Sequence, residues 1–164
     1  MTSAIRVGLG VDVHQFAPPE AGRKMVLMGC EIPHDRGLEG HSDADVMLHA
    51  LMDALLGAAG LGDIGQHFPD TDEAYQSADS TRLLERVMGE LQTRGWKVVN
   101  ADVCLLGERP KVVPHRQRMR ERIAPLLGIP VEDLNVKATT TEKLGFTGRG
   151  EGLAAQAVAL IERS

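Results

Sequence analysis

The chain has 164 residues, a length that fits one compact domain, and 43% of them are hydrophobic, enough for an ordinary core. Its formal net charge of −5 argues against nucleic acid as the main partner, because binding to a phosphate backbone requires a concentrated basic surface. The sequence predicts neither a signal peptide nor a membrane span. It favours the cytoplasm, with Cys30 and Cys104 as reduced thiols.

The first predicted element is a strand over residues 4–14. Apolar side chains occupy every second position there, and the opposite face ends in Asp12 and His14 beside two glycines. A period of two is typical of a half-buried strand, and the glycines leave room for another group to approach. A loop over 17–23 and a second strand over 24–32 are expected next.

A helix is expected from Ser42 or Asp43 to about Leu56, and Ser42 with Asp45 resembles a capping box. Apolar periodicity and turn residues then predict further elements: a polar loop at 60–79, a helix at 80–94, a strand at 98–106, a helix at 114–127 and a strand at 134–140. Residues 153–161 fit either a helix, by their alanines, or a buried strand. This order predicts an α/β fold of the α+β type in one domain, 1–164, with helices on one face of a mixed sheet.

Asp12 and His14 are candidate metal ligands. Two residues apart on a strand, both side chains leave the same face and can meet one ion. Histidine together with a carboxylate suits zinc, manganese or iron rather than calcium. A hydrogen-bonded surface pair is the alternative interpretation.

The segment 41–49 offers a third ligand in either of two histidines. His49 lies among apolar residues within the predicted helix, one turn from Asp45 and from Asp53. It is either a core histidine paired with one of these carboxylates or a zinc ligand whose second ring nitrogen such a carboxylate holds. His41 precedes the helix, where it is either a ligand or a contact for phosphate.

Two further segments have the composition of substrate-binding loops. Residues 62–72 contain three aspartates, which can accept hydrogen bonds from sugar hydroxyls or hold hydrated Mg²⁺, although the same residues are common in solvated turns. Residues 137–152 combine threonines, glycines and cationic groups, a set suited to phosphate, without the spacing of a P-loop. An ordinary glycine-rich turn is the alternative there.

Together these blocks resemble one enzyme family, 2-C-methyl-D-erythritol 2,4-cyclodiphosphate synthase, over about residues 6–161. The motifs that carry the resemblance are Gly10-x-Asp12-Val13-His14, His41–Asp45 with His49, Gly62–Asp72, Ala78-Asp79-Ser80 and Lys137–Gly152. The resemblance implies conversion of 4-diphosphocytidyl-2-C-methyl-D-erythritol 2-phosphate to 2-C-methyl-D-erythritol 2,4-cyclodiphosphate with release of CMP. This is a phosphorus–oxygen lyase reaction of non-mevalonate isoprenoid biosynthesis. A two-layer sandwich with a ferredoxin-like core, in which residues 153–161 form a strand, is also implied.

The resemblance assigns roles to the candidate residues. It implies a zinc ion held by Asp12, His14 and His49, and a second ion, Mg²⁺ or Mn²⁺, held with the help of Glu142. His41 and Thr140 become catalytic residues, with His41 near the substrate's phosphates. The implied substrate contacts are Ser42, Asp63, Ile64, Gly65, Phe68, Pro69, Asp70, Thr71, Asp72, Gly107, Pro110, Lys111, Val112, Val113, Thr139, Thr141, Phe146 and Arg149.

The implied assembly is a homotrimer with active sites between neighbouring subunits. The cytidine is expected between residues 107–113 and 139–142, and Phe146 and Arg149 are expected beside a central cavity that can bind an isoprenoid diphosphate. From the residues alone, two other hypotheses compete: a zinc-dependent phosphoester hydrolase and a non-catalytic module that binds isoprenoid diphosphates or nucleotides. An open metal site with three protein ligands argues against the second, because structural zinc has four.

Overall fold

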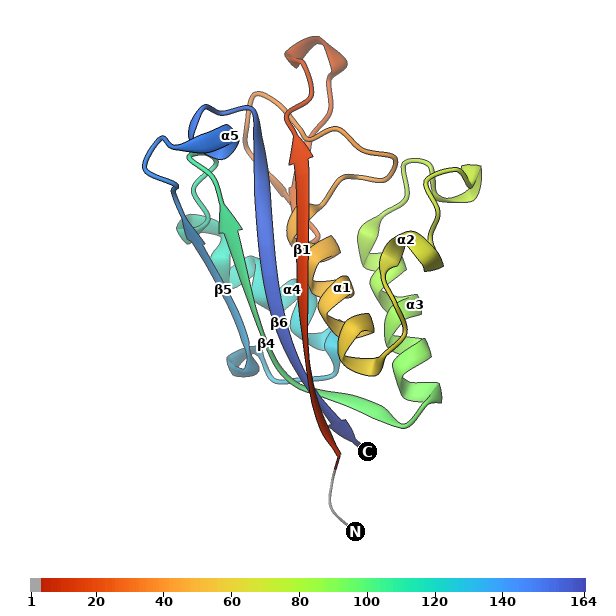
Figure 1. Ribbon diagram of the computed structural model, residues 1–164. Helices are drawn as coiled ribbons and strands as arrows, with labels where there is room; N and C mark the ends of the chain where they lie inside the picture. Colours follow the sequence, from red (N-terminus) through yellow and green to blue (C-terminus); the bar gives the residue numbers. More distant parts are fainter. Residues whose placement is uncertain (1–3) are drawn as a thin grey trace.

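A mixed sheet with the strand order β1-β6-β4-β5 forms one layer of the computed structural model, and the long helices α1, α3 and α4 lie against one of its faces (Figure 1). The structure describes residues 4–164, so the first three residues of the predicted domain lie outside it. The strands are β1 (Ile5–Gln15), β4 (Trp96–Leu106), β5 (Leu134–Thr139) and β6 (Gly152–Arg163), and the long helices are α1 (Val46–Ala59), α3 (Ser80–Thr93) and α4 (Arg116–Leu127).

The direction of the strands brings the predicted site segments to one end of the sheet. β6 runs antiparallel to both β1 and β4, and β5 runs parallel to β4, so β1, β4 and β5 all point the same way. Their carboxyl ends, and the loops that follow them, therefore lie at the same end of the sheet, at the top of Figure 1.

The layers match the prediction, but one detail does not. The sheet is mixed and the long helices cover one face, as expected. The sheet strands and long helices run in the order β-α-α-β-α-β-β, whereas a ferredoxin-like core runs β-α-β-β-α-β. The ferredoxin-like detail is therefore not confirmed.

Strand β1 is confirmed, but it packs on the core with the face that carries the glycines. A Cβ atom on Gly8 would lie 1.9 Å from the carbonyl oxygen of Ala54 in α1, and one on Gly10 would lie 1.8 Å from that of Ala50. The alternating apolar face is the exposed one: Ile5, Val7, Leu9, Val11 and Val13 are between 50% and 66% exposed in the single chain. The group that approaches the glycines is thus helix α1.

The segment predicted as one strand over 24–32 is a hairpin of β2 (Met25–Leu27) and β3 (Cys30–Ile32). The chain reverses at Met28 and Gly29, whose φ angles are 50° and 71°. Positive φ at both central residues is the geometry of a tight hairpin turn, and glycine adopts it without strain. Because most residues of this segment are apolar, its pattern favours one continuous strand and does not indicate the turn.

Helix α1 begins and ends later than predicted. Asp45 is its N-cap: its side chain accepts a hydrogen bond of 3.0 Å from the amide of Leu48, so Ser42 and Asp45 do not form a capping box. The same carboxylate accepts bonds from the amides of Met28 and Gly29 in the hairpin turn. Asp45 therefore joins the start of α1 to the hairpin, a contact that local spacing does not predict.

The remaining elements are close to their predictions. α3 begins after the cap residue Asp79, and α4 ends at Gly128, whose φ of 70° closes the helix as expected. A 3-10 turn over Val113–His115 precedes α4 at the predicted start. The polar loop at 60–79 contains a short helix, α2 (Ile64–His67), and another single turn, α5 (Gly145–Gly148), lies before β6.

The segment 153–161 is a strand, β6, which lies between β1 and β4. Its buried face alternates through Ala155, Ala157 and Ala159, each at most 1% exposed. Small side chains there let α1 pack closely on the sheet, so tertiary packing overrides the helical propensity of alanine. No helix within residues 4–164 is long and apolar enough to cross a membrane, and Cys30 and Cys104 are free thiols.

Candidate metal centre and active site

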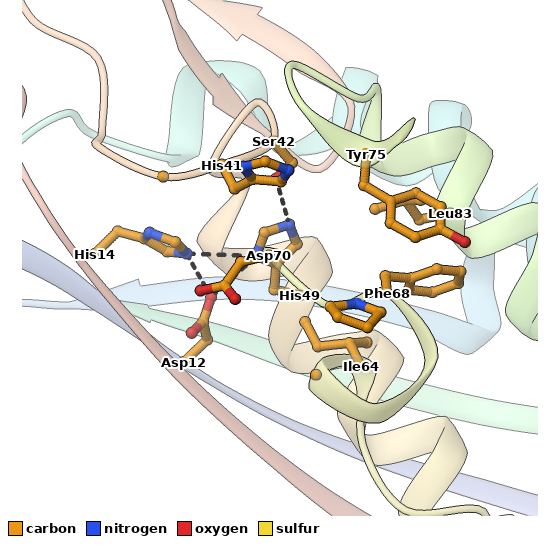
Figure 2. Close-up of a pocket in the computed structure, with 13 residues that line it drawn as sticks. Asp12, His14, His41, Ser42, His49, Ile64, Phe68, Asp70, Tyr75 and Leu83 are labelled. Carbon is orange, nitrogen blue, oxygen red and sulfur yellow. Dashed lines mark hydrogen bonds and ion pairs between the residues drawn. The ribbon is translucent and has the colours of Figure 1, made fainter. Parts of the chain in front are cut away.

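Asp12, His14 and His49 converge on one point at the carboxyl end of β1 (Figure 2). His14 Nε2 lies 2.8 Å from Asp12 Oδ2, His49 Nδ1 lies 3.2 Å from the same oxygen, and the two ring nitrogens are 3.4 Å apart. The structure thus brings together both residues of the predicted strand pair and one of the two candidate histidines. His41 is not a member of this group.

The triad forms because α1 lies so close to β1. Asp12 and His14 continue the strand face on which Gly8 and Gly10 touch the helix backbone. With no side chains at these two positions, the helix can lie directly on the strand. His49, in the first turns of α1, then reaches the two strand residues. The glycines and the ligands are therefore parts of one sequence feature.

The outer nitrogen of each histidine is held by a different kind of partner. His14 Nδ1 lies 2.6 Å from the carbonyl oxygen of Glu39, which only accepts, so Nδ1 carries a proton and the neutral ring has its lone pair on Nε2. His49 Nε2 lies 2.9 Å from the hydroxyl of Ser80 and 3.2 Å from that of Ser42. Both rings are thereby oriented before any ion binds.

The carboxylate partner predicted for His49 is wrong. Asp45 caps α1 and binds the hairpin turn, as described above, and Asp53 accepts a hydrogen bond of 2.8 Å from the amide of Ile64. Residues one helical turn away lie beside His49 along the helix surface, while the ring extends sideways toward β1 and α3. Its partner therefore comes from α3, at Ser80.

The charges at the triad favour a bound cation. Burial alone would raise the pKa of Asp12, but hydrogen bonds and charge attraction from His14 and His49 outweigh it and lower that pKa to about 2. Burial acts to lower the pKa of His14, yet the Asp12 carboxylate and the Glu39 carbonyl raise it overall. A carboxylate that is ionised at neutral pH therefore faces two imidazoles across a gap of ligand dimensions.

The triad meets the geometric requirements of a divalent metal site. Ligand atoms about 2.0–2.1 Å from a tetrahedral zinc ion lie roughly 3.3 Å from one another, close to the separations of 2.8–3.4 Å seen here. Two imidazoles and one carboxylate suit zinc and its neighbours in the periodic table. Three protein ligands leave one coordination position for another group.

A cavity of about 410 Å³ opens beside the triad (Figure 2). Besides the triad, the predicted site residues that line it are His41, Ser42, Ile64, Gly65, Phe68, Pro69 and Asp70. Gly40, Tyr75 and Leu83 also line it and were not predicted as site residues. The apolar periodicity of α3 does mark Leu83 as an inward-facing position, but it gives no sign that a cavity lies there.

Within the loop at 62–72, three residues predicted to contact substrate do not line this cavity: Asp63, Thr71 and Asp72. Asp63 caps α2 by accepting from the amide of Gln66, and Asp72 accepts from the amide of Ala74. The carbonyl oxygen of Asp72 lies 3.0 Å from His41 Nε2. Two of the aspartates thus shape the loop that encloses the cavity, and one of them orients His41.

A second cavity, of about 370 Å³, lies beyond the carboxyl ends of β4 and β5. Its lining includes the predicted catalytic residue Thr140 and six predicted contacts, Gly107, Pro110, Lys111, Val112, Val113 and Thr139, together with Pro114 and Ala138. Thr141 and Glu142 follow in the same loop but are not part of the lining. Glu108 accepts a hydrogen bond of 2.8 Å from the amide of Lys143 and so ties the two loops together.

The two cavities are at opposite edges of the sheet. The triad depends on β1, the second cavity on β5, and β6 and β4 lie between them. At the usual spacing of roughly 4.8 Å between strands, these edges are about 14 Å apart. Phe146 and Arg149 line neither cavity; Phe146 is 40% exposed and Arg149 pairs with Glu151.

Comparisons with known proteins identify the family to which this chain belongs. The model of the YgbB family matches residues 5–162. The 2-C-methyl-D-erythritol 2,4-cyclodiphosphate synthase of Chloroherpeton thalassium is 57% identical over 159 residues, covering 97% of this chain and 99% of that protein. The bifunctional IspDF of Campylobacter jejuni superimposes with a TM-score of 0.93 at 42% identity, over 99% of this chain and 43% of that one.

A third relative is a complex with a nucleotide. The CDP complex of IspF from Plasmodium falciparum has a TM-score of 0.85 at 27% identity, over 100% of this chain and 99% of that one. The family match spans nearly all of the described chain, and the curated relative is similar over its whole length. The chain therefore belongs to the YgbB family, that of the 2-C-methyl-D-erythritol 2,4-cyclodiphosphate synthases.

Proposed function

We propose that this chain carries out the reaction of its family in the cavity beside Asp12, His14 and His49. It is a phosphorus–oxygen lyase that converts 4-diphosphocytidyl-2-C-methyl-D-erythritol 2-phosphate to 2-C-methyl-D-erythritol 2,4-cyclodiphosphate in non-mevalonate isoprenoid biosynthesis. The 2-phosphate attacks the β-phosphorus of the same molecule, the bond from that phosphorus to CMP breaks, and CMP leaves. The observation that carries this proposal is a three-ligand metal site open to a cavity of about 410 Å³.

The proposed ion is zinc, held by Asp12 Oδ2, His14 Nε2 and His49 Nδ1. When bound, zinc supplies Lewis acidity and positive charge where a phosphate group must be brought close to another anion. Glu142 is proposed to help hold a second ion, Mg²⁺ or Mn²⁺, on the diphosphate. Its exposed position in the loop after β5 leaves the side chain accessible from outside the chain.

The residues around the triad are proposed to position the substrate rather than to take its proton. A phosphate is already ionised at neutral pH, and phosphoryl transfer depends mainly on alignment and charge neutralisation. His41 donates from Nε2 to the Asp72 carbonyl, so a protonated ring can donate from Nδ1 to a phosphate oxygen. Ser42 and residues 64–70 line the same space. Thr140 is proposed to assist the transition state from the loop after β5.

We call the triad with its adjoining cavity the metal half, and the cavity lined by residues 107–114 and 138–140 the nucleotide half. The cytidine is proposed to bind in the nucleotide half, and the CDP complex of the Plasmodium falciparum relative supports this choice of ligand. The cytoplasm is the proposed compartment, in which the free thiols Cys30 and Cys104 would stay reduced.

A homotrimer with active sites between subunits is proposed from the placement of the two halves. The halves lie at opposite edges of the sheet, so in a closed ring the β5 edge of one chain can meet the β1 edge of the next. The exposed apolar face of β1, from Ile5 to Val13, supports burial against other subunits. Phe146 and Arg149, exposed before β6, are proposed to line a central cavity for an isoprenoid diphosphate.

The test compares His49→Ala with His41→Ala. His49→Ala removes a ligand, so zinc affinity should fall by more than roughly 100-fold, beyond the loss typical of outer partners, and turnover should be lost with it. His41→Ala should keep stoichiometric zinc and lower kcat by about 100-fold, the scale of one lost charge-stabilising contact. Zinc is measured by metal analysis, and turnover by CMP and cyclic product.

Two results would contradict the proposal. A His49→Ala variant with full zinc and full turnover would remove His49 from the metal site, and loss of zinc in His41→Ala would make His41 a ligand instead. Release of CMP with an open-chain product would indicate a hydrolase, because cyclisation consumes no water.

A further inference from the structure

Behind His49 lies a buried chain of polar groups that the proposed mechanism does not use. The ring Nε2 of His49 is 2.9 Å from Ser80 Oγ, and that hydroxyl is 2.5 Å from Asp43 Oδ1. Ser80 is completely buried at the first position of α3. Three separate segments thus meet at one metal ligand: helix α1, the loop before it and the start of α3.

The direction of these hydrogen bonds follows from the acceptor at the end of the chain. The carboxylate of Asp43 accepts from the amides of Ser80 and Asp45, at 3.0 and 3.1 Å. An ionised carboxylate only accepts, so the single hydroxyl proton of Ser80 points to Asp43. Ser80 Oγ must therefore accept from His49, which requires a proton on Nε2 of the ring. A ring that carries only this proton has its lone pair on Nδ1, the nitrogen that faces Asp12 and His14.

We propose that Ser80 and Asp43 are positioning residues that hold His49 in the tautomer and orientation needed to bind the metal through Nδ1. This inference rests on the proposed function, in which the triad binds zinc. A hydrogen-bonded outer nitrogen fixes the tautomer of a ligating histidine and raises its basicity. Asp43 extends this effect, since its charge acts on the ring through the hydroxyl of Ser80.

The hydrogen-bonded chain His49–Ser80–Asp43, which we call the relay, also connects the metal site to the loop that lines the substrate cavity. The amide of Asp43 donates to the carbonyl of Ala78, and the amide of Ser77 donates to the carbonyl of His41, at 3.1 and 2.7 Å. The segment that carries His41 is therefore held against the residues just before α3, and Asp43 takes part both in these contacts and in those that hold His49. One set of contacts sets the relative position of a metal ligand and a residue proposed to contact phosphate.

The test is Ser80→Ala, with Thr81→Val as its matched control. Both changes remove a buried hydroxyl from the first turn of α3, but the hydroxyl of Thr81 donates to Asp79 and is not part of the relay. Zinc affinity, measured by competition with a chromophoric chelator, should fall roughly 10–100-fold in Ser80→Ala, as for other outer partners of metal ligands. Thr81→Val should stay within about threefold of the unmodified chain.

A second measurement reports on the tautomer without metal. In the metal-free chain, at a pH where the His49 ring carries a single proton, its ¹⁵N resonances should show that proton mainly on Nε2. Ser80→Ala should mix in the Nδ1-protonated form, with Ser42 as the remaining partner of Nε2. A purely structural role for Ser80 would leave this ratio unchanged. If Ser80→Ala does not fold, Asp43→Asn decides the matter, with the same shift of tautomer and a weaker affinity expected.

The outcomes separate the two proposals. Zinc binding by the unmodified chain, with unchanged affinity and tautomer in Ser80→Ala, would overturn the positioning role and leave the metal site intact. A chain that binds no zinc would overturn the proposed function and this inference together. Weakened zinc binding with a mixed tautomer in Ser80→Ala, and neither change in Thr81→Val, would support both.

Discussion

The metal half is assembled within one chain, whereas the nucleotide half is exposed at the far edge of the sheet. Asp12, His14 and His49 meet through β1–α1 packing, and the outer nitrogen of each histidine has a partner. The loops at 107–113 and 139–142 consist mostly of exposed or half-buried residues. We therefore expect a chain on its own to bind a metal ion, and turnover to require a neighbouring chain.

The sharpest way to separate the two halves is to prevent assembly. Leu9→Asp places a charge in the middle of the exposed apolar face of β1, where the side chain points away from α1. An unpaired charge is costly to bury, so the proposed trimer should dissociate. Turnover should then fall by more than roughly 100-fold, the scale of losing one charge-stabilising contact or more, while zinc affinity stays close to that of the unmodified chain.

Light scattering measures the mass, and the chelator competition measures the affinity. Leu9→Val is the matched control, because it keeps an apolar, strand-forming side chain at the same place and should retain both assembly and turnover. A monomeric Leu9→Asp variant with full turnover would show that one chain contains a complete active site.

The metal half can be disturbed from the opposite face of the same strand. A Cβ atom on Gly10 would lie 1.8 Å from the Ala50 carbonyl, so Gly10→Ala must push α1 away from β1. We expect a loss of about 1–3 kcal/mol in the free energy of unfolding, typical of an overpacked core. Zinc affinity should fall at least roughly tenfold, because His49 moves away from Asp12.

Gly57→Ala is the control for this change. It adds a methyl group at an exposed position of α1. The nearest atom, the carbonyl oxygen of Leu9 in β1, is 3.9 Å from the added carbon. Replacing glycine within a helix by alanine should stabilise it by up to about 1 kcal/mol. Equal effects of the two substitutions on thermal unfolding would show that close β1–α1 packing does not position the triad.

The fold could be predicted where the signal is local. The period of two in β1 and the closing glycine of α4 each lie within a few residues of the feature they determine. The hairpin at Met28 and the burial of the glycine face of β1 depend on distant residues, namely Asp45 and helix α1. A single segment contains no information about what packs against it.

The same limit applies to the site. Asp12 and His14 follow from spacing on one strand, but spacing allows both His41 and His49 as the third ligand. The family resemblance selects His49, and the approach of α1 to β1 gives the physical reason. Ser80 lies 31 residues from His49, and its contact with the ring depends on how α3 packs beside α1. Helical spacing suggests a nearby carboxylate instead, which is why that prediction was wrong.

The smallest expected effect belongs to the nucleotide half. Lys111 lines the second cavity and is exposed, so its contact with a bound diphosphate should contribute about 1 kcal/mol, as is usual for solvated ion pairs. Lys111→Ala should therefore raise KM for the cytidyl substrate roughly fivefold at nearly constant kcat, the pattern of a contact made equally in ground and transition states. Zinc affinity should not change.

Lys97→Ala, which removes a lysine paired with Glu162 near the other end of β4, is the control and should leave KM unaltered. An unchanged KM in Lys111→Ala would exclude this lysine from nucleotide binding. A loss of zinc in the same variant would show that the two halves are not independent within one chain.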